Sequence, residues 1–370
     1  MSLIERIQLF HLRMPLVSPF ETSFGSITTR DCILLHVFSE GASGWGECVA
    51  DRDPGYAYET SGTAWHILEE FILPSIIGKD IPNPVDLQLQ LKSIRGHAMA
   101  KAGLEMALWD LTGKQQERSV QALLGGKAAA VPVGVSVGIQ ASPQALVETV
   151  DKYLQAGYQR IKIKIKPGRD VEDVRAVRAS FPQTLLQVDA NSAYTISDTD
   201  ALQALDGFGL LLIEQPLAED DLWDHHRLQA MLNTPICLDE SILSARHARQ
   251  ALEMGACRII NIKAGRVGGL SEARAIHDLC AAEGVPVWCG GMLETGVGRA
   301  ANLALASLPQ FLLPGDISAT DRYYAEDITQ ERFVLNQDST ISVPQGHGLG
   351  VTINTSALKQ YTLRELDYRV

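Results

Sequence analysis

Cysteine is scarce in this sequence and follows no pattern. The 370 residues include six cysteines, no two of which form a Cys-x-x-Cys pair or lie beside histidines at zinc-ligand spacing. We therefore expect no structural zinc site, and this usage is typical of a reducing compartment. Basic residues are also in deficit, since 32 Lys and Arg face 44 Asp and Glu, a formal net charge of −12. Nucleic acid is not an expected partner, because phosphate contacts need surplus Lys and Arg.

Long apolar runs are absent as well. No stretch approaches the ~20 apolar residues that span a bilayer, and the N-terminus lacks the basic and apolar segments of a secretory signal. We therefore expect a soluble, cytoplasmic protein with no membrane partner. The chain is 46% hydrophobic and 21% charged, which is typical of a folded protein. Its length fits two domains, or one large barrel with an addition.

The first part of the chain, residues 1–127, contains three strand-like segments followed by two amphipathic helical stretches. Strands grouped ahead of helices favour an α+β domain, with the three strands as an antiparallel meander. The five segments are residues 4–12, 31–39, 44–49, 59–77 and 97–117.

Residues 128–324 alternate short β-branched runs with helical patterns, which predicts a (β/α)8-type, TIM-like barrel. The remaining segment, 325–370, is β-rich and is expected to pack back on the first domain. The fold class is thus α/β, a barrel with an α+β capping domain built from the N-terminal region and the C-terminal tail. The eight strand candidates are residues 131–139, 160–166, 184–191, 209–216, 234–241, 257–265, 285–291 and 311–318.

His225 and His226 lie in an acidic helical stretch and are expected to be solvated.

A regular spacing joins five ionisable residues of the barrel region. Each follows an apolar run, and successive members are 25, 25, 25 and 24 residues apart. One strand-helix unit of such a barrel takes roughly 30 residues or slightly fewer, so each should end a successive strand, at the face where barrel enzymes build active sites. Charged groups are rarely buried unless they are paired or bind a metal, so we expect them to converge on one cavity. The five are Lys164, Asp189, Glu214, Asp239 and Lys263.

The order of these residues predicts a metal site between two bases. The three carboxylates are consecutive, and an all-oxygen set without Cys or His indicates a hard divalent ion, Mg²⁺ or Mn²⁺. Lys164 and Lys263 flank them, so each is placed to move a proton on one face of a bound substrate. Lys162 shares a strand face with Lys164. Two ammonium groups near a metal are expected to lower the lysine pKa and favour a general base.

Other interpretations of these residues remain open. A single Lys at a strand end is usually a solvated rim residue, and a single Asp before a helix is usually an N-cap. That interpretation predicts neither the regular spacing nor three acids between two bases. A Schiff-base aldolase would use Lys164 or Lys263 as a nucleophile but leaves the acids unexplained. A barrel that binds a partner without turnover would be supported by loss of a lysine or a metal ligand, and all five residues are present.

Five short motifs resemble those of the enolase superfamily, in its muconate-lactonizing subgroup. They are the Lys-x-Lys at 162–164, VDAN at 188–191, IEQP at 213–216, LDES at 238–241 and NIKAGRVGG at 261–269. The resemblance covers essentially the whole chain. It implies that Asp189, Glu214 and Asp239 bind Mg²⁺ and that Lys164 and Lys263 act on opposite faces of the substrate. The metal would stabilise the enediolate formed when the proton α to a carboxylate leaves.

Three longer segments look like the o-succinylbenzoate synthases that also racemise N-succinylamino acids. They are residues 290–309, 313–324 and 19–25, the last resembling the mobile cap loop of that group. The resemblance implies contacts to the substrate carboxylate or ring region, and a backbone that faces the succinyl group. The residues implied in the first are Ser136, Lys162 and Asn191, and in the second Gly291 and Met292.

Residues near these positions limit the class of substrate that we expect. Glu240 follows Asp239 and is expected to orient it or a lysine. Arg266, three residues beyond Lys263, either lowers the pKa of that lysine and favours racemisation, or is a surface residue that caps a helix or pairs with an acid. Asp316–Ser318 lacks the second acid that dipeptide epimerases of the superfamily use to hold an ammonium group, which favours an N-acylated or amine-free substrate.

We therefore expect an Mg²⁺-dependent enzyme that removes the proton α to the carboxylate of a small substrate. The resemblance implies dehydration of a cyclohexadiene precursor to o-succinylbenzoate, in menaquinone synthesis, with racemisation of N-succinylamino acids as a second activity. Alternatives within the superfamily are a muconate-type cycloisomerase and a racemase of other N-acylamino acids. We also expect a homo-oligomer.

Overall fold

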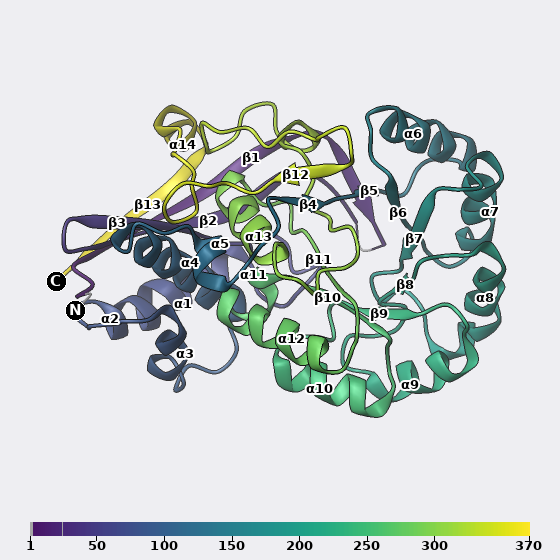
Figure 1. Cartoon of the computed structure of the whole chain (residues 1–370), viewed down its shortest axis with the longest axis horizontal. Coiled ribbons are helices and arrows are strands. Elements are labelled where there is room, and N and C mark those ends of the chain that lie inside the picture. The colour runs from purple at the N-terminus through teal and green to yellow at the C-terminus, as the bar shows by residue number, and fades with distance from the viewer. Residues whose placement is uncertain (1–2, 24) are drawn as a thin grey trace.

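The structure, a computed structural model, describes residues 3–23 and 25–370 (Figure 1). It contains a four-stranded antiparallel sheet at one end and a seven-stranded parallel sheet at the other, and a two-stranded ribbon joins β4 (Ala130–Pro132) to β12 (Thr340–Ser342). The predicted mobile loop 19–25 includes Phe24, which lies outside the described residues. Its neighbours form the tip of a hairpin, in which Thr22 pairs with Gly25.

The antiparallel sheet confirms the predicted meander and adds a fourth strand from the end of the chain. Its order is β13-β1-β2-β3, and Arg6 at the start of β1 pairs with Arg369 at the end of β13. The strands are β1 (Arg6–Thr22), β2 (Gly25–Ser39), β3 (Ala42–Cys48) and β13 (Thr362–Arg369).

Helix α4 (Ala98–Gln115) lies against this sheet because two glycines of β3 let the backbones approach. A Cβ atom on Gly44 would lie 2.1 Å from the carbonyl oxygen of Ala107, and one on Gly46 would lie 2.1 Å from that of Gly103. The other predicted helix is a continuous run with a π-helical turn in its middle. Its parts are α1 (Ser61–Ile67), η1 (Leu68–Ile72) and α2 (Leu73–Ile76), and η2 (Pro84–Asp86) and α3 (Leu87–Gln90) follow it.

The parallel sheet contains seven of the eight predicted strands, which lie side by side in chain order and curl (Figure 1). They are β5 (Val135–Val137), β6 (Arg160–Lys164), β7 (Leu185–Asp189), β8 (Ile213–Glu214), β9 (Ile236–Leu238), β10 (Ile259–Ile262) and β11 (Val287–Cys289). Most connecting helices lie outside the curl. These are α6 (Pro143–Gln155), α7 (Asp170–Ser180), α8 (Thr199–Gln203), α9 (Leu222–Met231), α10 (Ala245–Met254) and α12 (Leu270–Ala282). The short helix α11 (Ala264–Val267) is buried and packs against α4.

The eighth predicted strand, residues 311–318, is not a named strand in the described part of the chain. Pro314 has no amide hydrogen to give to a ladder, which limits pairing there. The segment still bonds to both edges of the parallel sheet. The Asp316 amide donates to the carbonyl of Cys289, the last residue of β11, at 2.8 Å, and the Gly315 carbonyl accepts from the residue before β5 at 2.8 Å.

The remaining elements surround these sheets. They are α5 (Val120–Leu124), α13 (Gly296–Ala306), α14 (Thr355–Tyr361), and the 3₁₀ turns η3 (Ile196–Asp198), η4 (Ala204–Phe208) and η5 (Thr320–Arg322). Every helix within residues 3–23 and 25–370 is too short or too polar to cross a bilayer.

The expectation of a solvated His225 is wrong, because this side chain is fully buried on the inner face of α9. Its Nε2 accepts a hydrogen bond from the Leu217 amide at 3.2 Å, and its Nδ1 lies 2.6 Å from the carbonyl oxygen of Asp221. Asp224 is the one acid of this stretch within α9, and residues 219–221 precede the helix, so the acidic composition does not show which face is covered.

Two buried carboxylates join the antiparallel half to helices of the parallel half. Glu105 of α4 accepts hydrogen bonds from the amides of Leu270 (2.7 Å) and Ser271 (3.0 Å) at the start of α12. Glu47 of β3 accepts from the Thr295 hydroxyl (2.6 Å) and the Gly298 amide (3.0 Å) at the start of α13. Each acid meets amides that a helix leaves unpaired at its N-terminus, where negative charge is favoured.

Candidate active site

The structure brings the five regularly spaced residues together at the carboxyl ends of neighbouring strands. Lys164 ends β6 and pairs in register with Asp189 at the end of β7, which pairs with Glu214 at the end of β8. Asp239 and Lys263 directly follow β9 and β10. All five side chains are buried.

One side of this cluster is built around the two lysines of β6. The Lys162 ammonium lies 2.9 Å from Glu214 Oε2 and 3.1 Å from Asp189 Oδ2, and that of Lys164 lies 2.6 Å from Asp189 Oδ2. Lys164 also donates to Asn191 Oδ1 at 2.6 Å. The lysines therefore share the carboxylates of the next two strands.

The carboxylates that face Lys162 and Lys263 set the direction in which the pKa of each lysine is shifted. Burial acts to lower the pKa of Lys162, but the negative charges of Asp316, Glu214 and Asp189 outweigh it and hold that pKa well above its usual range. Burial likewise acts to lower the pKa of Lys263, and the Asp239 charge outweighs it, so that pKa is raised. The expectation that two ammonium groups near a metal lower the pKa of the strand-end base concerns the metal-bound site and stays a prediction.

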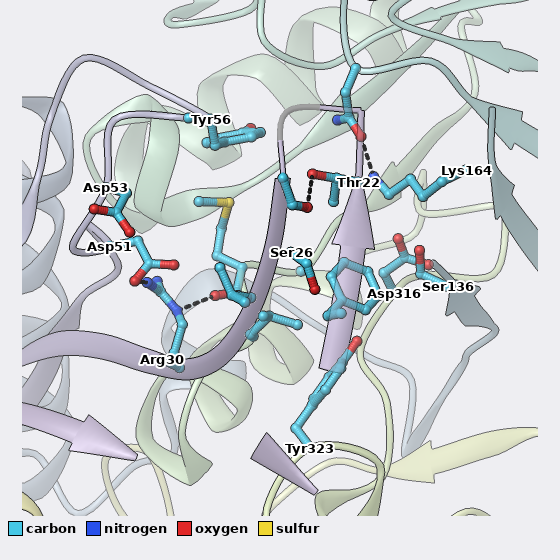
Figure 2. A pocket seen from close by; sticks show the side chains of 18 of the residues that line it. Thr22, Ser26, Arg30, Asp51, Asp53, Tyr56, Ser136, Lys164, Asp316 and Tyr323 are labelled. Carbon is cyan, nitrogen blue, oxygen red and sulfur yellow. Dashed lines mark hydrogen bonds and ion pairs between the residues drawn. The ribbon is translucent and has the colours of Figure 1, made fainter. Parts of the chain in front are cut away.

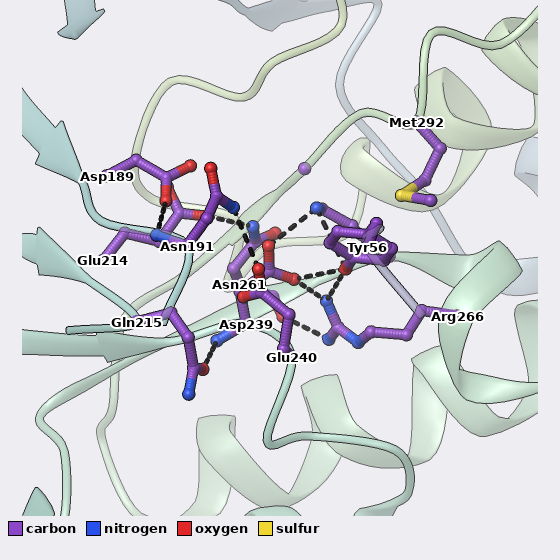
Figure 3. Close-up of polar contacts among 12 residues, drawn as sticks. Tyr56, Asp189, Asn191, Glu214, Gln215, Asp239, Glu240, Asn261, Arg266 and Met292 are labelled. Atoms are coloured by element: carbon purple, nitrogen blue, oxygen red, sulfur yellow. Dashed lines mark hydrogen bonds and ion pairs between the residues drawn. The ribbon is translucent and has the colours of Figure 1, made fainter. Parts of the chain in front are cut away.

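Lys263 and Arg266 form the other side of the cluster, around Asp239; Figure 3 labels Arg266 and Asp239. The Lys263 ammonium lies 2.7 Å from Asp239 Oδ2, and the Arg266 guanidinium forms an ion pair with Oδ1 of the same carboxylate. Arg266 also donates to the carbonyl oxygens of Ile242 and Asn261, each at 2.8 Å. Only 2% of Arg266 is exposed, so the interpretation as a surface residue is wrong, whereas pairing with an acid is observed.

Three residues that the sequence analysis missed hold the cluster in place. Gln215 Oε1 accepts from the Asp239 amide at 2.9 Å, and Asn261 Nδ2 donates to Glu214 Oε1 at 2.8 Å. The Tyr56 hydroxyl, from the loop after β3, donates to Asp239 Oδ1 at 2.9 Å. Alternation along β10 could have identified Asn261, which lies two residues before the strand-end lysine. No such signal marks the tyrosine.

Glu240 lies beside the carboxylates and is buried. Its Oε1 accepts from Asn191 Nδ2 at 2.9 Å, and its Oε2 is a buried atom without a hydrogen-bond partner. Burial and the negative charge of Asp239 raise the pKa of Glu240 to about 8. Asn191 has a φ of 44° and Gln215 a φ of 36°, so two of the supporting side chains extend from backbone in the sparsely populated left-handed region.

Above this cluster lies a cavity of about 220 Å³ between the two halves of the chain (Figure 2). The hairpin of β1 and β2 and the loop after β3 supply one wall, and the strand ends supply the other. Both strand-end lysines, Lys164 and Lys263, line it. All five residues implied in substrate contact also line it, namely Ser136, Lys162, Asn191, Gly291 and Met292.

The Met292 backbone is held from both sides. Its carbonyl accepts from Arg30 Nε at 3.0 Å, and its amide donates to Glu294 Oε2 at 2.9 Å. Arg30 is 2% exposed and also forms an ion pair with Asp51 Oδ1 at 3.1 Å. The 291–292 segment is therefore fixed against the antiparallel half of the chain.

Asp316 lines the cavity and forms ion pairs with two cations. Its Oδ1 lies 2.7 Å from Nη1 of Arg160, which has no exposed surface, and its Oδ2 lies 2.6 Å from the Lys162 ammonium. Both carboxylate oxygens therefore already face a cation, and the negative charge is compensated.

The donor chemistry of the site fits a hard divalent ion. Asp189, Glu214 and Asp239 offer only oxygen, as Mg²⁺ and Mn²⁺ prefer, and burial together with the Asp189 charge raises the pKa of Glu214 well above its usual range. Asn261 Oδ1 is a further buried oxygen without a hydrogen-bond partner. Among the residues at 3–23 and 25–370, no three His, Cys, Asp or Glu side chains surround a common centre, and lysine ammonium groups lie between the carboxylates instead.

Comparisons with known proteins agree with this architecture. Residues 5–125 match the family model "Mandelate racemase / muconate lactonizing enzyme, N-terminal domain", and residues 145–357 match "Enolase C-terminal domain-like". The chain is 52% identical to an o-succinylbenzoate synthase of Geobacillus kaustophilus over 97% of this chain and 96% of the relative. It is 51% identical to an N-succinylamino acid racemase of an Amycolatopsis species, over 96% of each chain. A crystal structure of an enolase superfamily member from Listeria innocua superposes with a TM-score of 0.96 at 42% identity, covering 100% of both chains.

Proposed function

Because the chain belongs to the enolase superfamily, we propose that it removes the proton α to a carboxylate, as an o-succinylbenzoate synthase that also racemises N-succinylamino acids. The observation that carries this is the placement of Lys164 and Lys263 on β6 and after β10, so that both line one cavity with the carboxylates between them. Relatives of both names, each about half identical over nearly the full length, support the two activities.

Lys164 and Lys263 are the two bases in this proposal. In racemisation one lysine takes the α proton, the C–H electron pair moves into the carboxylate to give an enediolate, and the other lysine returns a proton on the opposite face. In dehydration one lysine takes the proton, the C–O bond then breaks, and the same lysine gives its proton to the departing hydroxide, so that water and the aromatic product leave. The other lysine then acts only through its positive charge. Ser136, Asn191 and the 291–292 backbone would orient the substrate in the cavity.

We propose that Asp189, Glu214 and Asp239 hold Mg²⁺, with Mn²⁺ as the alternative. When bound, the ion would stabilise the negative charge that develops on the substrate carboxylate as the proton leaves. Glu240 and Gln215 would fix the ligands from outside, through Asn191 and the Asp239 amide. A fixed ligand orientation of this kind needs buried partners, and both side chains are buried.

The engagement of Asp316 supports an N-acylated or amine-free substrate. A free ammonium group in the cavity would need an uncompensated carboxylate, and the two Asp316 oxygens are already paired with Arg160 and Lys162. The unacylated amino acid should therefore exchange its α proton far more slowly than its N-succinyl derivative does.

Three further points of organisation belong to this proposal. Residues 311–318 would take the position of the eighth strand and close the parallel sheet into a barrel. Their hydrogen bonds to both edges of the sheet support this. The chain would divide into a cap (1–127), a barrel (128–324) and a tail (325–370) that completes the cap. The cytoplasm is the proposed location, since all six cysteines are free and buried, and a homo-oligomer stays a prediction.

The deciding experiment measures o-succinylbenzoate formation from its cyclohexadiene precursor by purified protein with Mg²⁺. We expect turnover that EDTA abolishes and added Mg²⁺ restores. Turnover that survives EDTA, together with trapping of a substrate adduct on lysine by borohydride, would favour the Schiff-base aldolase instead. Loss of both dehydration and N-succinylamino acid racemisation, with turnover of a muconate, would favour the cycloisomerase.

A further inference from the structure

We propose that Tyr56 is a positioning residue for one of the two bases, Lys263, so that its loss slows proton transfer on one face of the substrate only. The inference rests on the proposed function, because it concerns proton transfer on one of the two faces of the substrate in that reaction. Tyr56 belongs to the loop between β3 and α1, in the antiparallel half of the chain, whereas the lysine that it contacts follows β10 in the parallel half. Figure 3 shows Tyr56 beside Asp239 and Arg266.

The Tyr56 side chain contacts Lys263 in two ways. The Lys263 ammonium donates to the Tyr56 hydroxyl at 3.1 Å, and it lies 4.4 Å from the centre of the phenol ring. The hydroxyl in turn donates to Asp239 Oδ1 at 2.9 Å. The ammonium thus has the ring on one side and Asp239 Oδ2, at 2.7 Å, on another, an arrangement that leaves little freedom to a flexible lysine side chain.

Arg266 completes this group and explains why the hydroxyl is needed. It forms an ion pair with Asp239 Oδ1 and donates to the Tyr56 hydroxyl at 3.4 Å. Two cations therefore share the Asp239 carboxylate, one at each oxygen. The hydroxyl lies between them, accepts from both and donates to the carboxylate, so it keeps each cation at its own oxygen. Without it, the Lys263 ammonium is held by a single oxygen and can rotate away.

The other base is held without Tyr56. Lys164 bonds to Asp189 Oδ2 and Asn191 Oδ1, each at 2.6 Å, and both partners belong to the parallel half. A change at Tyr56 therefore alters the surroundings of one lysine and leaves the direct partners of the other in place. This asymmetry gives the proposal a readout that a general loss of stability would not produce.

The test measures α-proton exchange with solvent ²H for N-succinyl-L- and N-succinyl-D-phenylalanine by ¹H NMR. Lys263→Ala and Lys164→Ala first identify which enantiomer exchanges through which lysine. We expect Tyr56→Phe to lower kcat for exchange through Lys263 by about tenfold, the effect of one lost hydrogen bond to a charged group. Exchange through Lys164, and the KM of both enantiomers, should change by less than about twofold.

Tyr58→Phe is the matched control, because this tyrosine is in the same loop, is 64% exposed and is not among the cavity-lining residues. It should leave both exchange rates at the wild-type level. Equal slowing of both enantiomers by Tyr56→Phe, or no slowing of either, would overturn the proposal.

A second measurement does not depend on turnover. Acetic anhydride labels accessible amines, and peptide mass spectrometry gives the ratio of acetylation at Lys263 to that at Lys164. Tyr56→Leu removes the ring and should raise this ratio severalfold, whereas Tyr56→Phe, which keeps the ring, should raise it much less. An unchanged ratio in a Tyr56→Leu protein with wild-type melting temperature would also overturn the proposal.

The two measurements separate the possible failures. Wild-type protein that neither exchanges N-succinylphenylalanine nor forms o-succinylbenzoate refutes the proposed function, and the labelling ratio still decides whether Tyr56 holds Lys263. Wild-type exchange of both enantiomers with equal effects of Tyr56→Phe refutes the positioning role alone.

Discussion

Glu47 Oε2 lies 3.0 Å from the backbone amide nitrogen of Gly298, so a carboxylate from the antiparallel sheet meets the first turn of helix α13. Burial raises the pKa of Glu47 to about 7, against the opposing effect of the hydrogen bonds from Thr295. The group therefore keeps its proton in the folded protein at a pH where the unfolded chain has lost it.

Glu47 should make the free energy of unfolding fall as the pH rises from about 4.5 to about 7. Because the Glu47 pKa is higher in the folded state, the folded protein binds more protons than the unfolded chain over this range. The stabilisation is therefore complete below the pKa of the unfolded chain and is lost as the pH rises through the pKa of the folded protein. The linked change is about 3 kcal/mol at most, from 1.36 kcal/mol per pKa unit. Urea unfolding across this range should show the decline in the wild type and a flatter profile in Glu47→Gln. Parallel profiles for the two proteins would contradict the assignment.

Lys263→Arg should separate a proton-transfer role from an electrostatic one. Arginine keeps the positive charge beside Asp239 but does not release a proton near neutral pH. Racemisation of N-succinylamino acids, which needs both lysines as bases, should fall by about a hundred- to ten-thousandfold. Dehydration should retain a larger share of its rate if Lys263 acts there through its charge. The matched variant Lys164→Arg should lose both activities if Lys164 is the base for dehydration. A Lys263→Arg enzyme that racemises at the wild-type rate would rule out the two-base scheme.

Mg²⁺ should raise the melting temperature of the protein in the absence of substrate. An ion that binds only the folded state stabilises it by about 2.7 kcal/mol when its concentration is a hundredfold above the Kd. Asp189→Asn removes one proposed ligand and should reduce or abolish the shift, as should EDTA in the wild type. Asp278→Asn, at an exposed carboxylate on α12 whose side chain is 58% exposed, is the control and should shift as the wild type does. An equal Mg²⁺ shift in both variants would place the ion elsewhere.

Gly46→Ala should destabilise the protein strongly. The added Cβ would lie 2.1 Å from the carbonyl oxygen of Gly103 and 2.5 Å from the amide nitrogen of Ala107, both backbone atoms of α4 that cannot move aside singly. Overpacking of this kind costs about 1–3 kcal/mol or more. Gly207→Ala is the matched control, since a Cβ there meets nothing within 4 Å, and thermal unfolding should leave it near the wild type. Similar melting temperatures for the two variants would contradict the close packing of β3 on α4.

The sequence predicted much of this arrangement because one period repeats through it. Residues such as Lys164 and Asp189 could be placed on successive strands, since each unit adds a similar length of chain and each strand ends in the same layer. The meander and helix α4 followed from alternation and from periodic leucines. Segment 311–318 has the composition of a strand, but Pro314 has no amide hydrogen to donate to a neighbouring strand. A prediction from composition does not take account of one missing hydrogen-bond donor.

Residues that act across the two halves could not be predicted. Tyr56 contacts Lys263 from more than two hundred positions away, and no spacing relates an irregular loop to a strand end. The direction of the Lys162 pKa depends on how many carboxylates face the ammonium and how closely, which distances decide and residue order does not. The burial of His225 was missed for a similar reason, because a helix shows which face is covered only when its neighbours are known.

Strand β13 pairs with β1, and the Val370 amide donates to the carbonyl of Glu5 at 3.3 Å, so the two ends of the described chain lie side by side in one sheet. During synthesis on the ribosome, β1 emerges before the parallel sheet and its edge partner β13 emerges after it. The antiparallel sheet therefore cannot gain its edge strand β13 until the whole parallel sheet has been synthesised. Joining the ends through a short linker and opening the chain at an exposed turn such as Glu40–Gly41 would bring β1 and β13 out together, and refolding of such a permuted chain should no longer depend on this late pairing.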